Sequence, residues 1–191
     1  MTFRYLGVFF VLVLVLAGCR REAPADGPDP DATPAADADA DAQARADAAA
    51  AERAAMERRE REEATATARD ILERIVYFEF DSERLSAEAQ EDMRMKAEIL
   101  RANPDLRIRV EGHADERGST EYNLALGQRR AESIRTFLTN FGVSSGQIST
   151  LSYGKERPRA QGSNERAWAE NRRAEFVVTA GEISTVPSGL R

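Results

Sequence analysis

The sequence predicts an α/β domain, a two-layer sandwich whose mixed sheet is covered by helices on one face. Two observations lead to this prediction. From residue 71 to residue 180, apolar residues recur alternately with strand-like and helix-like periods, in the order β-α-β-α-β-(α)-β. A stretch of this length can bury one core, and strands that alternate with helices form a sheet on which those helices pack.

Each strand is predicted from a short run of apolar, β-branched or aromatic residues. The first run, 75–81, would place Val76, Phe78 and Phe80 on one face. In the second run, 106–111, apolar and charged residues alternate, which is typical of a half-buried strand. Two further strands are expected at 148–153 and 173–179.

The helices are predicted from caps and apolar stripes. Ser86 can cap a helix that ends before Asn103-Pro104 and buries Ala89, Met93, Ala97 and Leu100. A second helix is expected from Thr120 to Phe141, with a core face of Leu124, Ala131, Ile134, Leu138 and Phe141. A helical turn is expected at 164–170. Residues 181–191 are expected to form a flexible tail because they carry little to bury.

Residues 1–18 predict a signal peptide. After the positive charge of Arg4, an apolar run extends to Ala17, shorter than the roughly 20 residues that cross a bilayer. The run ends in Leu-Ala-Gly-Cys19, which resembles the lipobox of bacterial lipoproteins, so Cys19 is expected to carry lipid. A plain secretory signal is the alternative, but Cys19 is the only cysteine in the chain and lies at the cleavage point. By the sorting pattern of such lipoproteins, Arg20 favours the outer membrane.

Residues 19–70 predict a tether. Residues 22–50 are rich in Ala, Asp and Pro, have almost nothing to bury, and are expected to be disordered. Residues 48–68 are rich in Ala, Glu and Arg, with opposite charges four residues apart, as in Glu57 and Arg61, and favour an exposed helix. Because they lack a sustained apolar stripe, a coiled coil is the weaker alternative.

Charge and cysteine content exclude some classes. The chain has 27 basic and 33 acidic residues, a net charge of -6 and no basic block, so nucleic acid is not an expected partner. A single cysteine excludes an internal disulfide, and the domain must be stable through its core alone.

The polar motifs fall where this architecture brings chain segments together. The first strand ends at Phe80-Asp81, the second runs into the loop GHADERG at 112–118, and the second helix carries Asn123 and Arg130. Strand ends that meet the start of a helix make a crevice at one edge of the sheet. Residues 123 and 130, seven apart, lie almost on one line along the helix. We therefore expect a binding site at this edge.

Four stretches resemble a known family, the OmpA-like peptidoglycan-binding domain, over roughly residues 72–180. They are VYFEFDSERL, VEGHADERGSTEYNLALGQRRAESI, SYGKERP and AENRRAEFV. With a lipobox upstream, the GHADERG form is most similar to the peptidoglycan-associated lipoprotein (Pal) branch of that superfamily. The tether is longer than the family leads one to expect.

The resemblance implies a ligand, the peptidoglycan stem peptide at its meso-diaminopimelate, which presents a carboxylate and an ammonium on one stereocentre. Asp115 would bind the ammonium and Arg130 the carboxylate, because arginine can grip a carboxylate through two parallel hydrogen bonds. The other ligand-binding residues implied are Phe80, Asp81, Arg117, Ser119, Asn123 and Leu126.

These assignments have structural alternatives. Asp115 can merely fix a turn, and Phe80 can be a core aromatic. Arg130 can lie on the surface, paired with Glu121 or Glu132. The residues interpreted as structural are Tyr77, Tyr122, Trp168, Arg172 and Arg173.

His113 is the only histidine of the chain and is expected to be structural. A metal site with Asp115 and Glu116 would lack a second histidine and a free thiolate, and no nucleophile elbow is present for a Ser-His-Asp triad. We therefore expect no catalysis, no metal and no cofactor.

The resulting expectation is a lipid-anchored protein of the cell outer membrane whose periplasmic domain holds peptidoglycan non-covalently. The resemblance also implies TolB and other Tol proteins as partners, in the Tol-Pal system of cell division. One alternative is a regulatory OmpA-like lipoprotein that acts on an inner-membrane signalling enzyme. The other is a cell-wall-modifying enzyme such as an amidase, for which the sequence shows no metal ligands.

Overall fold

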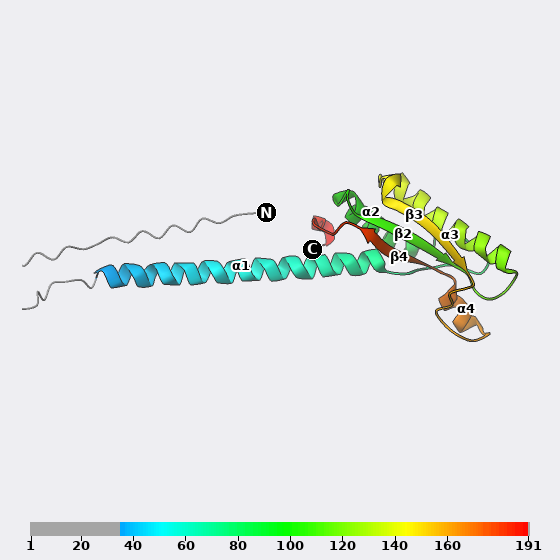
Figure 1. Ribbon diagram of the computed structural model, residues 1–191, viewed down its shortest axis with the longest axis horizontal. Helices are drawn as coiled ribbons and strands as arrows, with labels where there is room; N and C mark the ends of the chain where they lie inside the picture. Colours follow the sequence, from blue (N-terminus) through cyan, green and yellow to red (C-terminus); the bar gives the residue numbers. More distant parts are fainter. Residues whose placement is uncertain (1–34, 191) are drawn as a thin grey trace, which may run out of the picture. The chain divides into compact units, whose positions relative to one another are not determined.

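The computed structural model describes residues 35–190, and within them the elements follow the expected order (Figure 1). The predicted signal peptide, Cys19 and the first part of the tether lie outside the described residues. The elements are α1 (Ala35–Glu73), β1 (Val76–Tyr77), α2 (Ala87–Ala102), β2 (Arg107–His113), α3 (Thr120–Asn140), η1 (Ser145–Gln147), β3 (Ile148–Gly154), α4 (Glu165–Asn171), β4 (Arg173–Ala180) and η2 (Ser188–Leu190).

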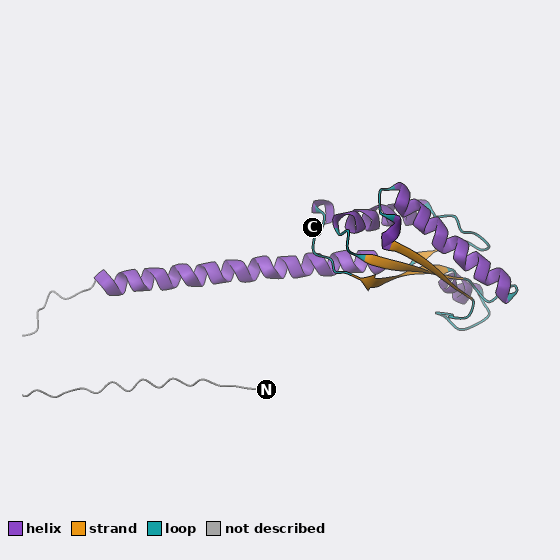
Figure 2. Cartoon of the chain, turned by 45° about the horizontal axis from the view of Figure 1, so that its top comes forward, coloured by secondary structure: helices purple, strands orange, loops and turns teal. Residues whose placement is uncertain are grey.

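The strands form one mixed sheet in the order β1-β4-β2-β3. β4 is antiparallel to both β1 and β2, and β3 is parallel to β2, with α3 as the connection between them. In the register of β2 and β4, Val110 pairs with Phe176 and Glu111 pairs with Glu175. Figure 2 shows α2 and α3 on the same side of the sheet. The predicted fold class, a mixed sheet covered by helices on one face, is confirmed.

α2 begins after the cap predicted for it, and α3 begins after a serine cap that was not predicted. Ser86 Oγ accepts a hydrogen bond from the backbone N–H of Ala89 at 3.1 Å, and Ser119 Oγ accepts one from Tyr122 at 3.2 Å. Two residues expected in the core, Leu124 and Phe141, are each 39% exposed. The buried stripe of α3 runs through 123, 126, 127, 130, 131, 134 and 138, so Leu124 lies beside it, and Phe141 lies just past the last helical residue.

α1 begins earlier than expected. Residues 22–50 were expected to be disordered, but from Ala35 onward they are helical. No proline follows Pro34 in this stretch, alanine has the highest helix propensity, and aspartates near a helix N-terminus interact favourably with its dipole. Within residues 35–190, no helix has the length and apolar character that a bilayer crossing requires.

The last turns of α1 belong to the packed domain. Ala68 and Leu72 are fully buried in the core. Lys96 of α2, also fully buried, donates hydrogen bonds from Nζ to the carbonyl oxygens of Ile71 at 2.6 Å, Leu72 at 2.9 Å and Arg74 at 2.7 Å. Carbonyls at a helix C-terminus have no partner within the helix. Lys96 therefore caps α1 from a neighbouring helix, and the core starts slightly before residue 71.

The first strand and the C-terminal segment also differ from expectation. β1 has two residues, and it ends at Tyr77 because its antiparallel partner β4 begins only at Arg173. The C-terminal segment does not fray, since Ile183 and Val186 are 7% and 6% exposed. The side-chain amide of Asn103 binds the main chain of Ser184 and Thr185 at 2.8 to 2.9 Å. The flexible tail expected at 181–191 is therefore wrong for these residues.

Candidate functional site

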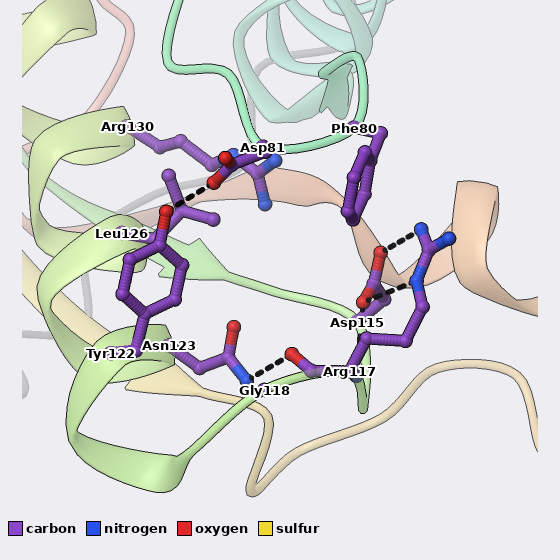
Figure 3. A pocket seen from close by; sticks show the side chains of 9 residues that line it. All are labelled: Phe80, Asp81, Asp115, Arg117, Gly118, Tyr122, Asn123, Leu126 and Arg130. Atoms are coloured by element: carbon purple, nitrogen blue, oxygen red, sulfur yellow. Dashed lines mark hydrogen bonds and ion pairs between the residues drawn. The ribbon is translucent and has the colours of Figure 1, made fainter.

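A pocket of about 170 Å³ lies at the predicted edge of the sheet, between the chain after β1, the loop after β2 and the start of α3 (Figure 3). Seven of the eight predicted site residues line it, together with two that were not predicted. The exception is Ser119, whose hydroxyl caps α3. The lining residues are Phe80, Asp81, Asp115, Arg117, Gly118, Tyr122, Asn123, Leu126 and Arg130.

The pocket depends on a close approach between α3 and β2. A Cβ atom at Gly112 would lie 1.9 Å from the carbonyl oxygen of Gly127, and a Cβ atom at Gly127 would lie 2.3 Å from Oγ of Ser152. Only glycine lets the helix backbone rest on the strand backbone here. The first turns of α3 are thereby held against the loop that leaves β2.

Asp115, in that loop, is 5% exposed and lies between two arginines. Its carboxylate accepts hydrogen bonds from the backbone N–H and Nε of Arg117, both at 3.1 Å, and from Nη2 at 2.6 Å. Nη1 of Arg172 is 3.6 Å away. Burial acts to raise the pKa of Asp115, but the hydrogen bonds and charge of Arg117 and the charge of Arg172 outweigh it and lower the pKa below its usual value. Asp115 is therefore ionised at neutral pH.

The guanidinium of Arg117 is held between two aromatic rings. Its central carbon lies 4.0 Å from the ring centroid of Phe80 and 4.2 Å from that of Trp168, which is a cation–π arrangement on both faces. Phe80 is 59% exposed, so the alternative that it is a core aromatic is wrong. Figure 3 shows its ring standing at the side of the pocket near Asp115 and Arg117.

Arg130 is fully buried under the pocket and is not the surface residue considered as the alternative. Its guanidinium donates to the carbonyl oxygens of Ser82 at 2.8 Å, His113 at 2.7 Å and Glu79 at 3.0 Å. Among the described residues it forms no ion pair. Burial lowers the pKa of Arg130 to about 10, against the raising effect of the Asp115 charge. Arg130 thus places a positive charge without a paired carboxylate at the base of the pocket.

Asp81 and Tyr122 close one side of the pocket. The hydroxyl of Tyr122 donates a hydrogen bond to Oδ1 of Asp81. Asp81 has a φ of 51°, in the left-handed region that aspartate tolerates better than most residues. Tyr122 is 46% exposed, so its interpretation as a packing residue is wrong.

Asn123 and Leu126 supply the α3 side of the pocket. Asn123 is 2% exposed, and its Nδ2 donates to the carbonyl oxygen of Arg117 at 2.8 Å, which fixes the loop against the helix. Leu126 is 4% exposed and gives the pocket an apolar wall.

His113 lies outside this pocket. Gly112 faces α3, and because successive strand residues face opposite sides, the ring of His113 points to the other face of the sheet. The ring lies 5.4 Å from that of Tyr153, measured between centroids. Burial lowers the pKa of His113 to about 4, and the charges of Arg173 and Arg157 act in the same direction. In the described part of the chain, His113 does not form the metal cluster considered with Asp115 and Glu116.

Sequence reasoning missed three parts of the site: Gly118, Tyr122 and the stacking of Trp168 on Arg117. A signal existed for Tyr122, which lies in the first turn of a helix expected to border the crevice. The stacking of Trp168 had no comparable signal, because it depends on where α4 packs.

Comparison with known proteins places this geometry in a family. The model of the OmpA family matches residues 77–172. A protein of Brucella melitensis named peptidoglycan-associated lipoprotein is 47% identical over 103 residues, which cover 54% of this chain and 61% of that protein. One of the same name from Pseudomonas aeruginosa is 48% identical over 100 residues, covering 52% and 59%. The match thus spans about three fifths of these relatives.

Solved structures agree on the fold. The crystal structure of the peptidoglycan-associated lipoprotein from Burkholderia pseudomallei is 45% identical and superposes with a TM-score of 0.55, covering 56% of this chain and 90% of that one. The C-terminal domain of Helicobacter pylori MotB, at 24% identity and a TM-score of 0.53, covers 56% and 85% and shares the fold. Since the family model spans half of the sequence and includes every residue of the pocket, the chain belongs to the OmpA family.

Proposed function

We propose that the domain binds peptidoglycan non-covalently, with the pocket holding the meso-diaminopimelate of a stem peptide. The observation that carries the proposal is the lining of one small pocket by opposite charges, Asp115 and Arg130, beside the apolar side chains of Phe80 and Leu126. A zwitterionic group needs both charges at once, and the cavity of about 170 Å³ suits the head of one amino acid.

Arg130 suits the carboxylate end of such a ligand. Three of its five N–H groups bind main-chain carbonyls, which fixes the guanidinium and leaves two N–H groups. Because the described residues offer it no paired carboxylate, a ligand carboxylate would supply the missing negative charge. A charge-assisted hydrogen bond in a buried setting is stronger than one between neutral groups.

Asp115 suits the ammonium end of the ligand, but its carboxylate also forms an ion pair with Arg117. A carboxylate has about four lone-pair sites, and three hydrogen bonds from Arg117 reach Asp115. One site is left for the ligand. We infer that Asp115 binds the ligand and also orients Arg117, so that the two act as a unit.

The wider role follows from the relatives and from the N-terminal segment. We propose that Cys19 carries lipid that anchors the chain in the outer membrane, and that the domain tethers this membrane to the cell wall. The matched relatives are named peptidoglycan-associated lipoproteins, which supports both parts of the proposal. Membership of a Tol-Pal system in cell division, with TolB as a partner, is part of the same proposal.

We further propose that the site is not catalytic. A general acid or base works best when its pKa is near the ambient pH. The pKa of Asp115 lies below its usual value, and the only histidine points to the opposite face of the sheet. The pocket therefore suits recognition of charge and not proton transfer.

The test is retention of the full-length chain on purified peptidoglycan sacculi. Asp115→Asn keeps the shape of the side chain and removes its charge, so we expect bound protein to fall at least about 10-fold, as expected for the loss of a charged hydrogen-bond partner. Asp105→Asn, the same change at an exposed turn away from the pocket, should leave retention unchanged.

Free meso-diaminopimelate should release the wild-type chain from the sacculi, while its derivative with the amino groups acetylated should not. Equal retention of Asp115→Asn and wild type, at equal circular dichroism, would sink the assignment of the pocket.

A further inference from the structure

The face of the sheet opposite α2 and α3 carries a second polar cluster, outside the pocket. Glu111 and His113 are two residues apart on β2 and therefore project to the same face. Glu175 on β4 is the register partner of Glu111. One potential ligand atom from each of these three side chains lies within 4.8 Å of the others.

His113 is the unusual member of this cluster. It is 2% exposed; one ring nitrogen makes only a marginal hydrogen bond with the backbone of Arg157, and the other has no hydrogen-bond partner among the described residues. A buried polar group without a partner costs about 1–3 kcal/mol of stability. A buried ring with one such nitrogen, beside two carboxylates, therefore points to a bound species that is coordinated by nitrogen and oxygen together.

The close approach of the two glutamates also points to a bound cation. Like charges directly opposite each other on neighbouring strands are destabilising. Each is held by an arginine of its own strand, Glu111 by Arg109 at 2.7 Å and Glu175 by Arg173 at 2.6 Å, both through Oε1. Each carboxylate thus keeps its second oxygen. Such outer contacts are what fix ligating carboxylates in metal sites.

We propose that Glu111, His113 and Glu175 form a binding site for a divalent transition-metal ion, with Zn²⁺ as the best match. One imidazole nitrogen and two carboxylate oxygens suit Zn²⁺, whereas Ca²⁺ and Mg²⁺ prefer oxygen ligands alone. The three side chains leave a fourth tetrahedral position for water.

The three ligand atoms would have to move only slightly closer together to bind one ion. Ligand atoms around a tetrahedral zinc lie roughly 3.3 Å apart, given bonds of about 2.0 Å. Reaching this from 4.8 Å requires side-chain shifts of about an ångström, which long glutamate side chains provide. Glu175, of intermediate exposure, gives an ion a path from solvent.

A bound ion would stabilise the sheet and would not take part in ligand binding in the pocket. It would join β2 to β4 through side chains, across the same strands that the main-chain ladder connects. The backbone oxygen of His113 binds Arg130, so the ion would also hold the residue on which the pocket's arginine rests.

The experiment uses the fact that His113 is the only imidazole in the chain. The full-length chain carries Cys19→Ser, which removes the only thiol, and is purified through a tag without histidine. The ring nitrogens are followed by ¹⁵N NMR during titration with ZnCl₂ after treatment with EDTA. We expect one ring nitrogen to shift and to saturate at one equivalent of Zn²⁺, and MgCl₂ to have no effect.

Two variants locate the site. Glu175→Gln should weaken Zn²⁺ binding at least about 10-fold, because it replaces a charged ligand by a neutral amide. Glu182→Gln, the same change at an exposed position outside the cluster, should bind Zn²⁺ like the parent. An unmoved ring signal in millimolar Zn²⁺, or equal binding by Glu175→Gln, would overturn the proposal. Because sacculi play no part in this titration, its outcome is independent of the proposed peptidoglycan binding.

Discussion

Single charged residues in this domain serve the fold and the candidate site at once. Asp115 fixes the loop after β2 through Arg117, and the same carboxylate borders the pocket. Arg130 joins two backbone segments, residues 79–82 and the end of β2, through three carbonyls while placing its charge under the pocket. Substitutions at these positions must therefore be assessed for stability as well as for binding.

At the residue scale, His113 predicts a pH dependence of stability. Its pKa is lowered from 6.5 to about 4 by burial, with Arg173 and Arg157 acting in the same direction and Glu175 against it. Between these values the unfolded chain binds more protons, so the stability from His113 is complete above pH 6.5 and is lost as the pH falls through 4.

The measurement is urea denaturation at several pH values with EDTA present. The difference between wild type and His113→Phe should change by on the order of 2 kcal/mol between pH 7 and pH 4, with wild type losing more. Parallel curves for the two chains would show that the ring is not neutral and buried in solution.

At the element scale, the contact of α3 with β2 decides the shape of the pocket. The two glycines at the crossing allow backbone contact, and the Ser119 cap starts the helix just after the loop. The pocket is therefore built by two elements that meet without side chains between them.

This contact predicts a strong effect of one methyl group. Gly112→Ala would place a Cβ atom 1.9 Å from the backbone oxygen of Gly127, which a rotamer change cannot relieve. We expect a loss of about 3 kcal/mol in the free energy of unfolding, by overpacking, and a shift of α3. Gly146→Ala is the control, because its nearest neighbours are side-chain atoms at 3.7 Å or more, and urea denaturation compares the two.

The elements also show how far sequence reasoning reaches. The helices α2 and α3 were predictable to within one residue at each end, because both show clear periodic stripes, and because Ser86 precedes the first and Gly142 follows the second. β1 was predicted too long, because its length depends on where β4 starts. The seven lining residues were predicted from the motifs at the strand ends and on the second helix, together with the family resemblance. The ion pair between Arg117 and Asp115 was not predicted, because it depends on side-chain rotamers and on the position of α4.

At the scale of the whole domain, α1 and α2 are joined through Lys96. Its Nζ satisfies three carbonyls where α1 ends, and it lies 3.4 Å from Asp92. The apolar residues Ala68 and Leu72 secure the same turn in the core. The end of the helix thus belongs to the cooperative unit, although composition placed the boundary at residue 71.

We expect Lys96→Met to lower the free energy of unfolding by about 3 kcal/mol, because the buried carbonyl of Leu72 loses its donor, that of Ile71 keeps only the N–H of Arg74, and the part-buried carbonyl of Arg74 also loses its bond to Lys96. Lys155→Met is the matched control. Lys155 also donates to a carbonyl, that of Gly118 at 2.8 Å, but in an exposed setting, and its loss should cost less than about 1 kcal/mol. Chemical denaturation gives both values, and amide exchange at Ile71 and Leu72 should accelerate only in the first variant.

If the chain is anchored at its amino end and binds its ligand at the pocket, as proposed, the cap at the end of α1 has a mechanical consequence. Tension then enters the domain at α1, next to the two-residue strand β1. A buried ammonium with three short bonds resists sudden rupture at this point of entry. A weakly bound ligand would then dissociate before the domain unfolds. The force is released when the domain rebinds another ligand, and the domain stays folded.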